Sequence, residues 1–87
     1  MIKMGPREIL NKLKWHPSKK FEDYEIIILH RGAPKDIKVI PTKLVTNLRK
    51  SFFHYKENEE EIMIPYHRIL KILNIKNKKV VWVKRGL

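Results

Sequence analysis

The fold of this chain is decided by residues 24–30, whose sequence is Tyr24-Glu25-Ile26-Ile27-Ile28-Leu29-His30. Their β-branched and aromatic side chains are typical of a strand. Successive side chains of a strand point to opposite faces, so the even-numbered residues from Tyr24 to His30 share one face and the odd-numbered residues from Glu25 to Arg31 share the other. Because both faces are apolar in the middle, the segment is predicted to be a central strand.

The residues that follow predict an antiparallel hairpin. Residues 32–36 have the composition of a turn, and Ile37–Ile40 alternates as a second strand. His30 and Arg31 then leave the first strand on opposite sides. A ligand shared by these two side chains requires the backbone to bend, and Gly32 is the residue type that allows such a bend.

One helix is predicted before this hairpin and a second helix after it. The first begins at Gly5-Pro6, because proline suits the first helical position, and it ends before Pro17. The second begins at Thr42, a suitable N-cap, because the apolar residues after it have helical spacing. The apolar residues of these two helices are Ile9, Leu10 and Leu13 in the first and Leu44, Val45, Leu48 and Phe52 in the second.

The C-terminal half is predicted to add short strands. Lys56–Glu61 is expected to be a charged loop, and Glu61–Ile64 is expected to be a short strand that ends at Pro65. Residues 66–75 fit both a helix and a strand. We favour one helical turn over Pro65–Arg68 followed by a strand.

The last strand, Val80–Lys84, follows a predicted hairpin turn at Asn77–Lys79 and places Val80, Trp82 and Lys84 on one face. The predicted fold class is therefore α+β: a small antiparallel sheet of four to five short strands, packed by the N-terminal helix and one further helix. The segments Val39-Ile40-Pro41 and Met63-Ile64-Pro65 look alike, but three residues are too few to establish a repeat.

The composition predicts one basic, nucleic-acid-binding domain over residues 1–87. Twenty Lys and Arg against nine Asp and Glu give a formal net charge of +11, and such a field attracts polyanions. There is no cysteine, which excludes disulfides and thiol chemistry. The longest aliphatic run is too short to cross a bilayer, and the first residues do not form a signal peptide. We therefore expect a cytoplasmic protein with no membrane partner.

Two His-Arg pairs are the main candidate site. His30-Arg31 and His67-Arg68 each stand where an apolar run meets a glycine or proline. Histidine exchanges a proton near neutral pH, and arginine offers a rigid fork of donors suited to phosphate. Because Gly32 and Pro65 both turn the chain at the end of an element, we expect the two pairs to meet at one edge of the sheet and to bind an anion together.

Other candidate residues are more ambiguous. Trp15 is suited to base stacking, but a position at the edge of the core is favoured for a tryptophan just beyond an amphipathic helix. His16 is ambiguous from the residues alone, because most histidines of this kind lie at the surface. The acidic run Glu57–Glu61 is predicted to be solvated, and we expect neither a metal nor a cofactor.

Four motifs resemble a family of small domains described as an RNA cyclic-group-end recognition domain. They are residues 13–16, 30–33, 64–69 and 81–85. Members occur alone in archaea and, in larger proteins, beside modules that process RNA ends, so the resemblance implies RNA as the partner and RNA-processing proteins as possible neighbours. The residues expected to contact nucleic acid are His30, Arg31, Gly32, Tyr66, His67, Arg68, Trp15, His16, Lys84 and Arg85.

Three functions remain open at this point. The first is an RNA-binding module that recognises a phosphorylated or cyclic-phosphate end, with Tyr66 stacking on the terminal base. The second is a metal-independent RNA phosphodiesterase or cyclic-phosphate-opening enzyme, with His30 and His67 as acid and base. It is disfavoured because neither histidine begins the His-x-Thr or His-x-Ser pair of the two-histidine phosphoesterases. The third is a structural or protein-interaction domain.

Overall fold

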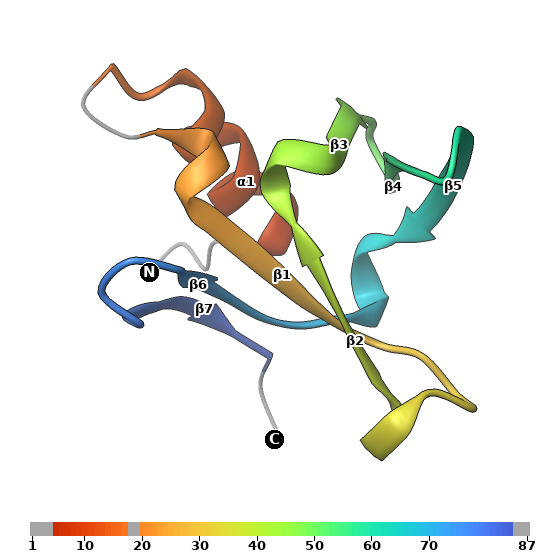
Figure 1. The fold of residues 1–87 in the computed structure, drawn as a ribbon. Helices are drawn as coiled ribbons and strands as arrows, with labels where there is room; N and C mark the ends of the chain where they lie inside the picture. Colours follow the sequence, from red (N-terminus) through yellow and green to blue (C-terminus); the bar gives the residue numbers. More distant parts are fainter. Residues whose placement is uncertain (1–4, 18–19, 85–87) are drawn as a thin grey trace.

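One α-helix and seven strands make up the regular structure of residues 5–17 and 20–84, the part of the chain that this computed structural model describes (Figure 1). Short 3₁₀ turns, labelled η, connect several of them. The elements are α1 (Pro6–Trp15), η1 (Phe21–Asp23), β1 (Tyr24–Leu29), η2 (Pro34–Asp36), β2 (Ile37–Pro41), η3 (Thr42–Leu44), β3 (Val45–Leu48), β4 (Phe52–Glu57), β5 (Glu60–Pro65), η4 (Tyr66–Arg68), β6 (Ile69–Asn74) and β7 (Val80–Val83).

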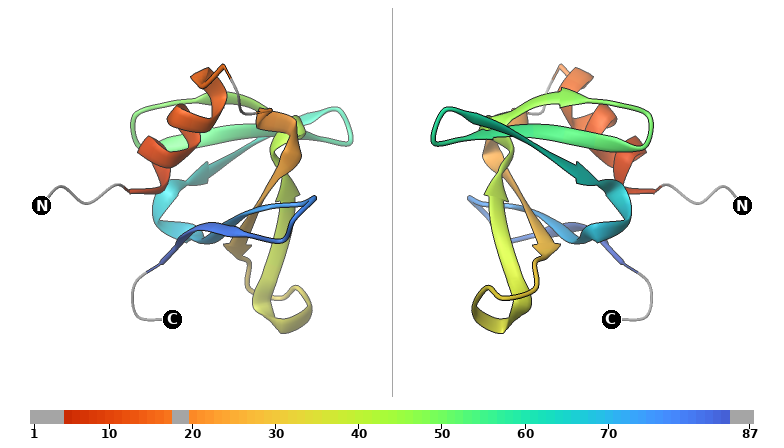
Figure 2. Two further views of the ribbon diagram at one scale, coloured as in Figure 1. Left: turned by 90° about the vertical axis from the view of Figure 1, so that its left-hand side faces the viewer. Right: turned by 90° about the vertical axis from the view of Figure 1, so that its right-hand side faces the viewer.

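The strands form two antiparallel sheets. The larger has the order β2-β1-β6-β7, and the smaller has the order β3-β4-β5. Strand β1 is hydrogen-bonded on both sides, so the prediction of a central strand with a β1–β2 hairpin is confirmed. Figure 2 shows the smaller sheet lying across the larger one, with α1 against one side of the pair.

The core lies between the two sheets and α1. Each sheet and α1 contribute hydrophobic side chains that are less than 10% exposed, and these side chains form the core. Alternation along β1 buries Tyr24, Ile26 and Ile28, as the period of a strand predicts. The other core residues are Leu10 and Leu13 of α1, Ile40 of β2, Phe53 and Tyr55 of β4, Ile64 of β5, Tyr66 of η4, and Ile69 and Ile72 of β6.

Two proline-led crossovers join the sheets. Pro41 precedes η3, which carries the chain from β2 into the smaller sheet, and Pro65 precedes η4, which carries it from β5 back into the larger one. The two prolines have nearly the same backbone angles, φ −63° and ψ 134° against φ −64° and ψ 143°. The first residue of each turn, Thr42 or Tyr66, is buried. The similarity noticed in the sequence therefore marks two equivalent connections.

The prediction of a second helix from Thr42 is wrong. Thr42 begins a single 3₁₀ turn, and Val45–Leu48 is strand β3. Val45, Thr46 and Asn47 are poor helix formers, so pairing with β4 prevails over an apolar spacing that suits both structures. The fold class remains α+β, but it has one helix rather than two and seven strands in two sheets rather than four or five in one.

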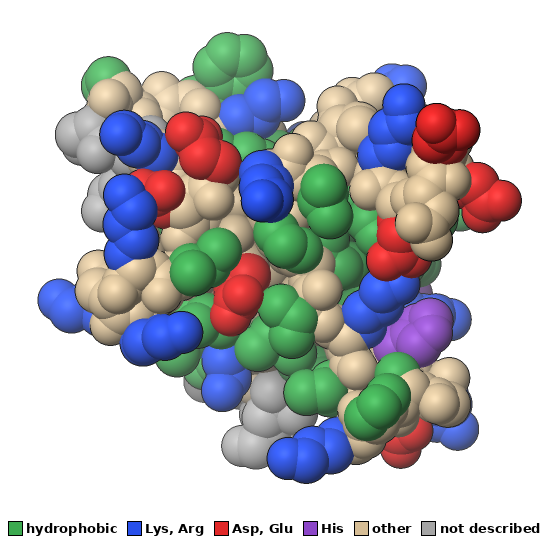
Figure 3. Space-filling model, in the orientation of Figure 1, with side chains coloured by type: hydrophobic (Ala, Val, Ile, Leu, Met, Phe, Trp, Pro, Cys, Tyr) green, Lys and Arg blue, Asp and Glu red, His purple; other side chains and the backbone are tan. Residues whose placement is uncertain are grey.

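The charged segment predicted as a loop is a hairpin instead. Strands β4 and β5 pair as far as Glu57 and Glu60, and the turn between them contains only Asn58 and Glu59. Both turn residues have positive φ, 51° and 65°, which is typical of a tight type I′ turn. Figure 3 shows acidic side chains over this hairpin and at several other places on the visible face, among Lys and Arg side chains.

The predictions for residues 66–84 are confirmed except that the last strand ends at Val83 rather than at Lys84. Residues 66–68 form one 3₁₀ turn and Ile69–Asn74 is a strand, as favoured for the ambiguous segment. A turn over residues 75–79 leads into β7, and the side-chain oxygen of Asn74 accepts hydrogen bonds from the backbone N–H groups of Lys76 and Asn77.

Helix α1 begins and ends as predicted, but Trp15 does not lie at the edge of the core. The Gly5 N–H donates to Oε1 of Glu8, and Pro6 is the first helical residue. Trp15 is 75% exposed, and Nζ of Lys14 lies 5.5 Å from the centre of its ring. No helix within the described residues is long and apolar enough to cross a membrane.

Thr42→Val should lower the free energy of unfolding by about 1–3 kcal/mol, because it removes a buried hydroxyl that donates a hydrogen bond to a backbone carbonyl. Oγ1 of Thr42 lies within hydrogen-bond distance of the Phe21 and Tyr24 carbonyl oxygens, 2.8 Å from the latter, and the side chain is 0% exposed. Urea unfolding measures the change. Thr46→Val is the matched control at an exposed site, and equal losses in the two variants would contradict this role for Thr42.

Tyr66→Phe should reduce the loss of stability at alkaline pH. Burial raises the pKa of Tyr66 above its ordinary value of 10.0, so the neutral phenol stabilises the fold below pH 10.0 and the contribution disappears as pH rises through the folded-state pKa. The pKa of Lys38 is also raised, by its hydrogen bond to Glu57, but Lys38 is present in both proteins.

Urea midpoints measured from pH 8 to pH 11 test the Tyr66 prediction. At pH 8 the variant should be about 1 kcal/mol less stable, because the Tyr66 hydroxyl donates to the Arg49 carbonyl at 2.6 Å. At pH 11 the gap between the two proteins should narrow. If the free energies of unfolding of the two proteins change in parallel with pH, the ionisation of Tyr66 is not linked to folding.

Candidate functional site

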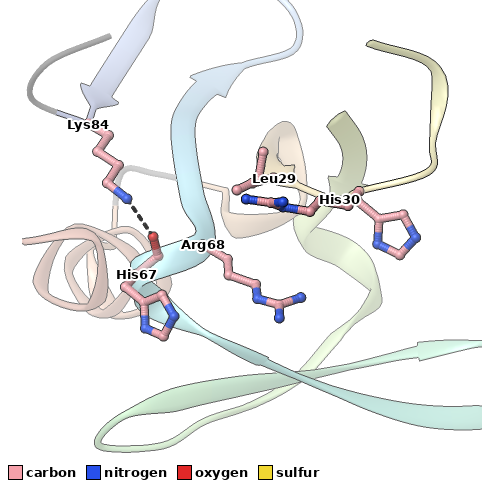
Figure 4. A pocket seen from close by; sticks show the side chains of 6 residues that line it. Leu29, His30, His67, Arg68 and Lys84 are labelled. Atoms are coloured by element: carbon pink, nitrogen blue, oxygen red, sulfur yellow. Dashed lines mark hydrogen bonds between the residues drawn. The ribbon is translucent and has the colours of Figure 1, made fainter. Parts of the chain in front are cut away.

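The two His-Arg pairs line one cavity of about 390 Å³ at an edge of the larger sheet (Figure 4). The loop after β1 contributes His30 and Arg31, and η4 contributes His67 and Arg68. The remaining wall comes from Leu29 and from Lys84, which follows β7. In Figure 4, the Arg68 side chain extends from η4 into the space between the His67 and His30 side chains.

Strand pairing brings these distant segments together. Strands β1 and β6 are antiparallel neighbours, and Ile28 near the end of β1 is paired with Ile69 at the start of β6. The residues just after Ile28 therefore lie beside the residues just before Ile69. The expected convergence of the His-Arg pairs at one sheet edge is the geometry observed.

Gly32 shapes the β1 side of the cavity. Its φ is +96°, which L side chains rarely adopt, so the chain turns sharply after Arg31. The turn is closed by hydrogen bonds from the His30 N–H to the Asp36 carbonyl at 2.8 Å and from the Ala33 N–H to the His30 carbonyl at 3.2 Å. His30 lies beyond the last residue of β1, so strand alternation no longer separates it from Arg31.

The 3₁₀ turn η4 shapes the opposite side. Tyr66 is buried and anchors the turn, which leaves His67 and Arg68 exposed. Nζ of Lys84 donates to the His67 carbonyl at 2.8 Å, so the end of β7 is held against η4 (Figure 4). Three different elements are thus joined around the cavity.

The cavity has cationic walls and no acidic side chain among its described lining residues. Arg31, Arg68 and Lys84 carry permanent charge at neutral pH. Within residues 5–17 and 20–84, no carboxylate pairs with either arginine. The nearby Asp36 carboxylate accepts the Gly32 N–H at 3.3 Å. Unpaired guanidinium groups retain all their donors for an external anion, and their fork geometry matches phosphate.

The remaining predicted contact residues lie outside this cavity. The ring of Tyr66 packs 6.0 Å from that of Phe53 and is 7% exposed, so it lies in the core and not where the predicted stacking on a terminal base requires it. Trp15 and His16 lie at the C-terminal end of α1. Arg85 is outside the described residues.

Leu29 lines the cavity but was not predicted as a site residue. Its 38% exposure is unusual for leucine, yet an aliphatic residue in a strand carries no chemical signal in the sequence. Among the described residues, no group of three or more His, Asp or Glu side chains is placed to hold a metal ion.

The comparisons with known proteins agree on one family. A family model described as the MJ1316 RNA cyclic group end recognition domain matches residues 4–84. A UPF0248 protein of Thermococcus sibiricus is 46% identical over 81 residues, which cover 93% of this chain and 86% of the relative. UPF0248 proteins of Methanococcus maripaludis strain C5 and Pyrococcus abyssi are 44% and 42% identical, over 91% and 100% of this chain and 97% and 98% of their own lengths. No solved structure matches the chain significantly. The chain therefore belongs to the MJ1316 RNA cyclic group end recognition domain family.

Proposed function

We propose that this protein is an RNA-binding module that holds the phosphate-bearing end of an RNA, such as a 2′,3′-cyclic phosphate, in the cavity between β1 and η4. One observation carries the proposal: both His-Arg pairs and Lys84 line a single cavity that has no acidic side chain among its described lining residues. The family description names the same class of ligand. The formal charge of +11 supplies a long-range attraction for the RNA.

Each cavity side chain has a proposed role. Arg31 and Arg68 approach the terminal phosphate from opposite sides and donate paired hydrogen bonds to its oxygens. His30 and His67 donate further N–H groups, and Lys84 adds charge from the end of β7. A cyclic phosphate keeps two unesterified oxygens, which is the number that one guanidinium fork can bind.

The exposed tryptophan extends the proposed interface. Trp15 stands beside Lys14, and Lys12 and His16 line a neighbouring hollow on the same helix. An exposed indole among cations is suited to stack on a base while lysines meet the phosphates around it. Trp15 therefore contacts a nucleotide further from the RNA end.

The test compares three RNAs of one sequence that differ only in their 3′ ends: a 2′,3′-cyclic phosphate, a 3′-monophosphate and a 3′-hydroxyl. Fluorescence anisotropy of a dye at the 5′ end measures affinity. Either phosphate end should bind about tenfold or more tightly than the hydroxyl, because only the phosphate supplies the anion for the two arginines. Equal affinities for all three would overturn end recognition.

The same samples distinguish binding from catalysis. His30 and His67 line one cavity, so the two side chains that an acid and base mechanism of cyclic-phosphate opening would use are both present there. After incubation without added metal, a recognition module leaves the cyclic phosphate intact on a denaturing gel. Conversion to a monophosphate that His30→Ala or His67→Ala abolishes would assign the enzyme function instead.

A further inference from the structure

A second hollow adjoins the cationic cavity. It has a volume of about 340 Å³ and shares His67 and Lys84 with that cavity. Its other lining residues are Pro6 of α1, Tyr66 of η4, Ile69 of β6 and Trp82 of β7. Most of this lining is apolar or aromatic, whereas most of the side chains that line the neighbouring cavity are those of His, Arg and Lys.

We propose that this hollow binds the base of the terminal nucleotide whose phosphate lies in the cationic cavity. The inference rests on the proposed function. Base and 3′ phosphate project from one ribose, so a nucleotide end needs an apolar site and an anion site separated by little more than a sugar. The shared residues His67 and Lys84 show that the two hollows lie side by side.

Trp82 gives the hollow its base-binding character. The indole is half-buried and packs against the core, so the fold holds its orientation. A rigid aromatic side chain binds a base through its ring faces, and such stacking accepts any base. With few polar groups in the lining, the hollow binds the terminal base without selecting among the four bases.

The sequence alone indicates part of this proposed base-binding site. Trp82 and Lys84 are two residues apart, so strand alternation predicts one face for both, and a cation beside an aromatic ring on one face is a pattern of nucleic-acid surfaces. Nothing in the sequence places Pro6 opposite them. That contact arises because α1 packs near β7, as Figure 2 shows.

A single-tryptophan variant gives a direct readout. The chain has two tryptophans, so Trp15→Phe leaves Trp82 as the only indole, and Trp15 is exposed enough for the change to spare the fold. The probes are two short RNAs with the same 2′,3′-cyclic phosphate, one with an intact terminal nucleotide and one whose terminal ribose lacks its base. The measurements are Trp82 fluorescence and affinity, repeated in the Trp15→Phe background with Arg68→Ala.

The intact RNA should quench Trp82 fluorescence and bind about tenfold more tightly than the RNA without the terminal base. Changing the terminal base among A, C, G and U should alter affinity by less than about threefold. An intact end that binds more tightly but leaves Trp82 fluorescence unchanged would place the base elsewhere and overturn the inference.

Failure of the base site is distinguishable from failure of the proposed function. If both RNAs bind equally, Trp82 fluorescence does not change, and Arg68→Ala weakens both, the phosphate site stands and the base site is wrong. If Arg68→Ala weakens neither RNA and the terminal phosphate has no effect on affinity, the proposed function fails and the base site fails with it.

Discussion

Arg31→Ala and Arg68→Ala should each weaken the binding of an RNA that ends in a 2′,3′-cyclic phosphate by about 10- to 100-fold. Each substitution removes hydrogen bonds between a charged donor and a charged acceptor, which contribute about 1.5–3 kcal/mol. Both side chains are exposed, and within the described residues neither is engaged by a carboxylate. The losses should therefore appear in affinity, measured by anisotropy, with little change in the free energy of unfolding.

The double variant should lose less affinity than the sum of the two single losses, because both arginines bind one phosphate group. Lys79→Ala is the charge-matched control, since Lys79 is exposed and lies at the far end of β6 from the cavity. Its loss should be no more than about threefold, from long-range attraction alone. Equal losses of affinity in the arginine variants and in Lys79→Ala would show that the RNA is bound only by non-specific electrostatic attraction. Additive losses would show that the two arginines have separate ligands.

RNA binding should depend steeply on salt. Contacts to single-stranded RNA release counterions at about 0.7 per phosphate neutralised, so neutralisation of the terminal phosphate and two neighbouring phosphates gives a slope of about −2 in a plot of log affinity against log salt concentration. Between 50 and 200 mM salt the affinity should therefore fall about 20-fold, and contacts near Trp15 make the slope steeper.

Arg68→Ala should reduce the magnitude of the slope by at most about 0.7, because it removes one of the two arginines that neutralise the terminal phosphate. Lys79→Ala should leave the slope unchanged. Titrations at four or more salt concentrations with each protein measure these differences. A flat response of the unaltered protein would exclude the polyanion interface altogether.

Local patterns predicted part of the fold. The β-branched run of β1, the proline and glycine punctuation around it and the amphipathic stripe of α1 each favour one structure, and each prediction is confirmed. The smaller sheet was missed because its signals are ambiguous. Leu44, Val45 and Leu48 match helical spacing by coincidence, and only pairing with β4 makes residues 45–48 a strand.

The hairpin between β4 and β5 was missed for a different reason. Glu57, Glu60 and Glu61 look like a solvated loop in sequence, but strand pairing leaves charged side chains near a hairpin end free to reach water. The formation of a tight turn by Asn58 and Glu59 depends on two positive φ angles, which charge patterning does not indicate.

The sequence predicted that the two His-Arg pairs lie together, and their binding role stays a prediction. Gly32 follows β1 and Pro65 ends β5, and these two strands belong to different sheets, so the pairs meet for another reason: the end of β1 pairs with the start of β6. The aromatic residues were misplaced. Tyr66 is buried and Trp15 exposed, the reverse of expectation, because both side chains suit either environment and only tertiary packing decides between them.

The most direct test of the cavity as the binding site for an RNA end is an NMR titration. Isotope-labelled protein would be titrated with a short RNA that ends in a 2′,3′-cyclic phosphate. The backbone amide signals of Arg31, Gly32, His67, Arg68 and Lys84 should shift most and saturate together, because these residues surround the bound phosphate. Largest shifts at the β4–β5 hairpin, with the cavity signals unmoved, would contradict this site.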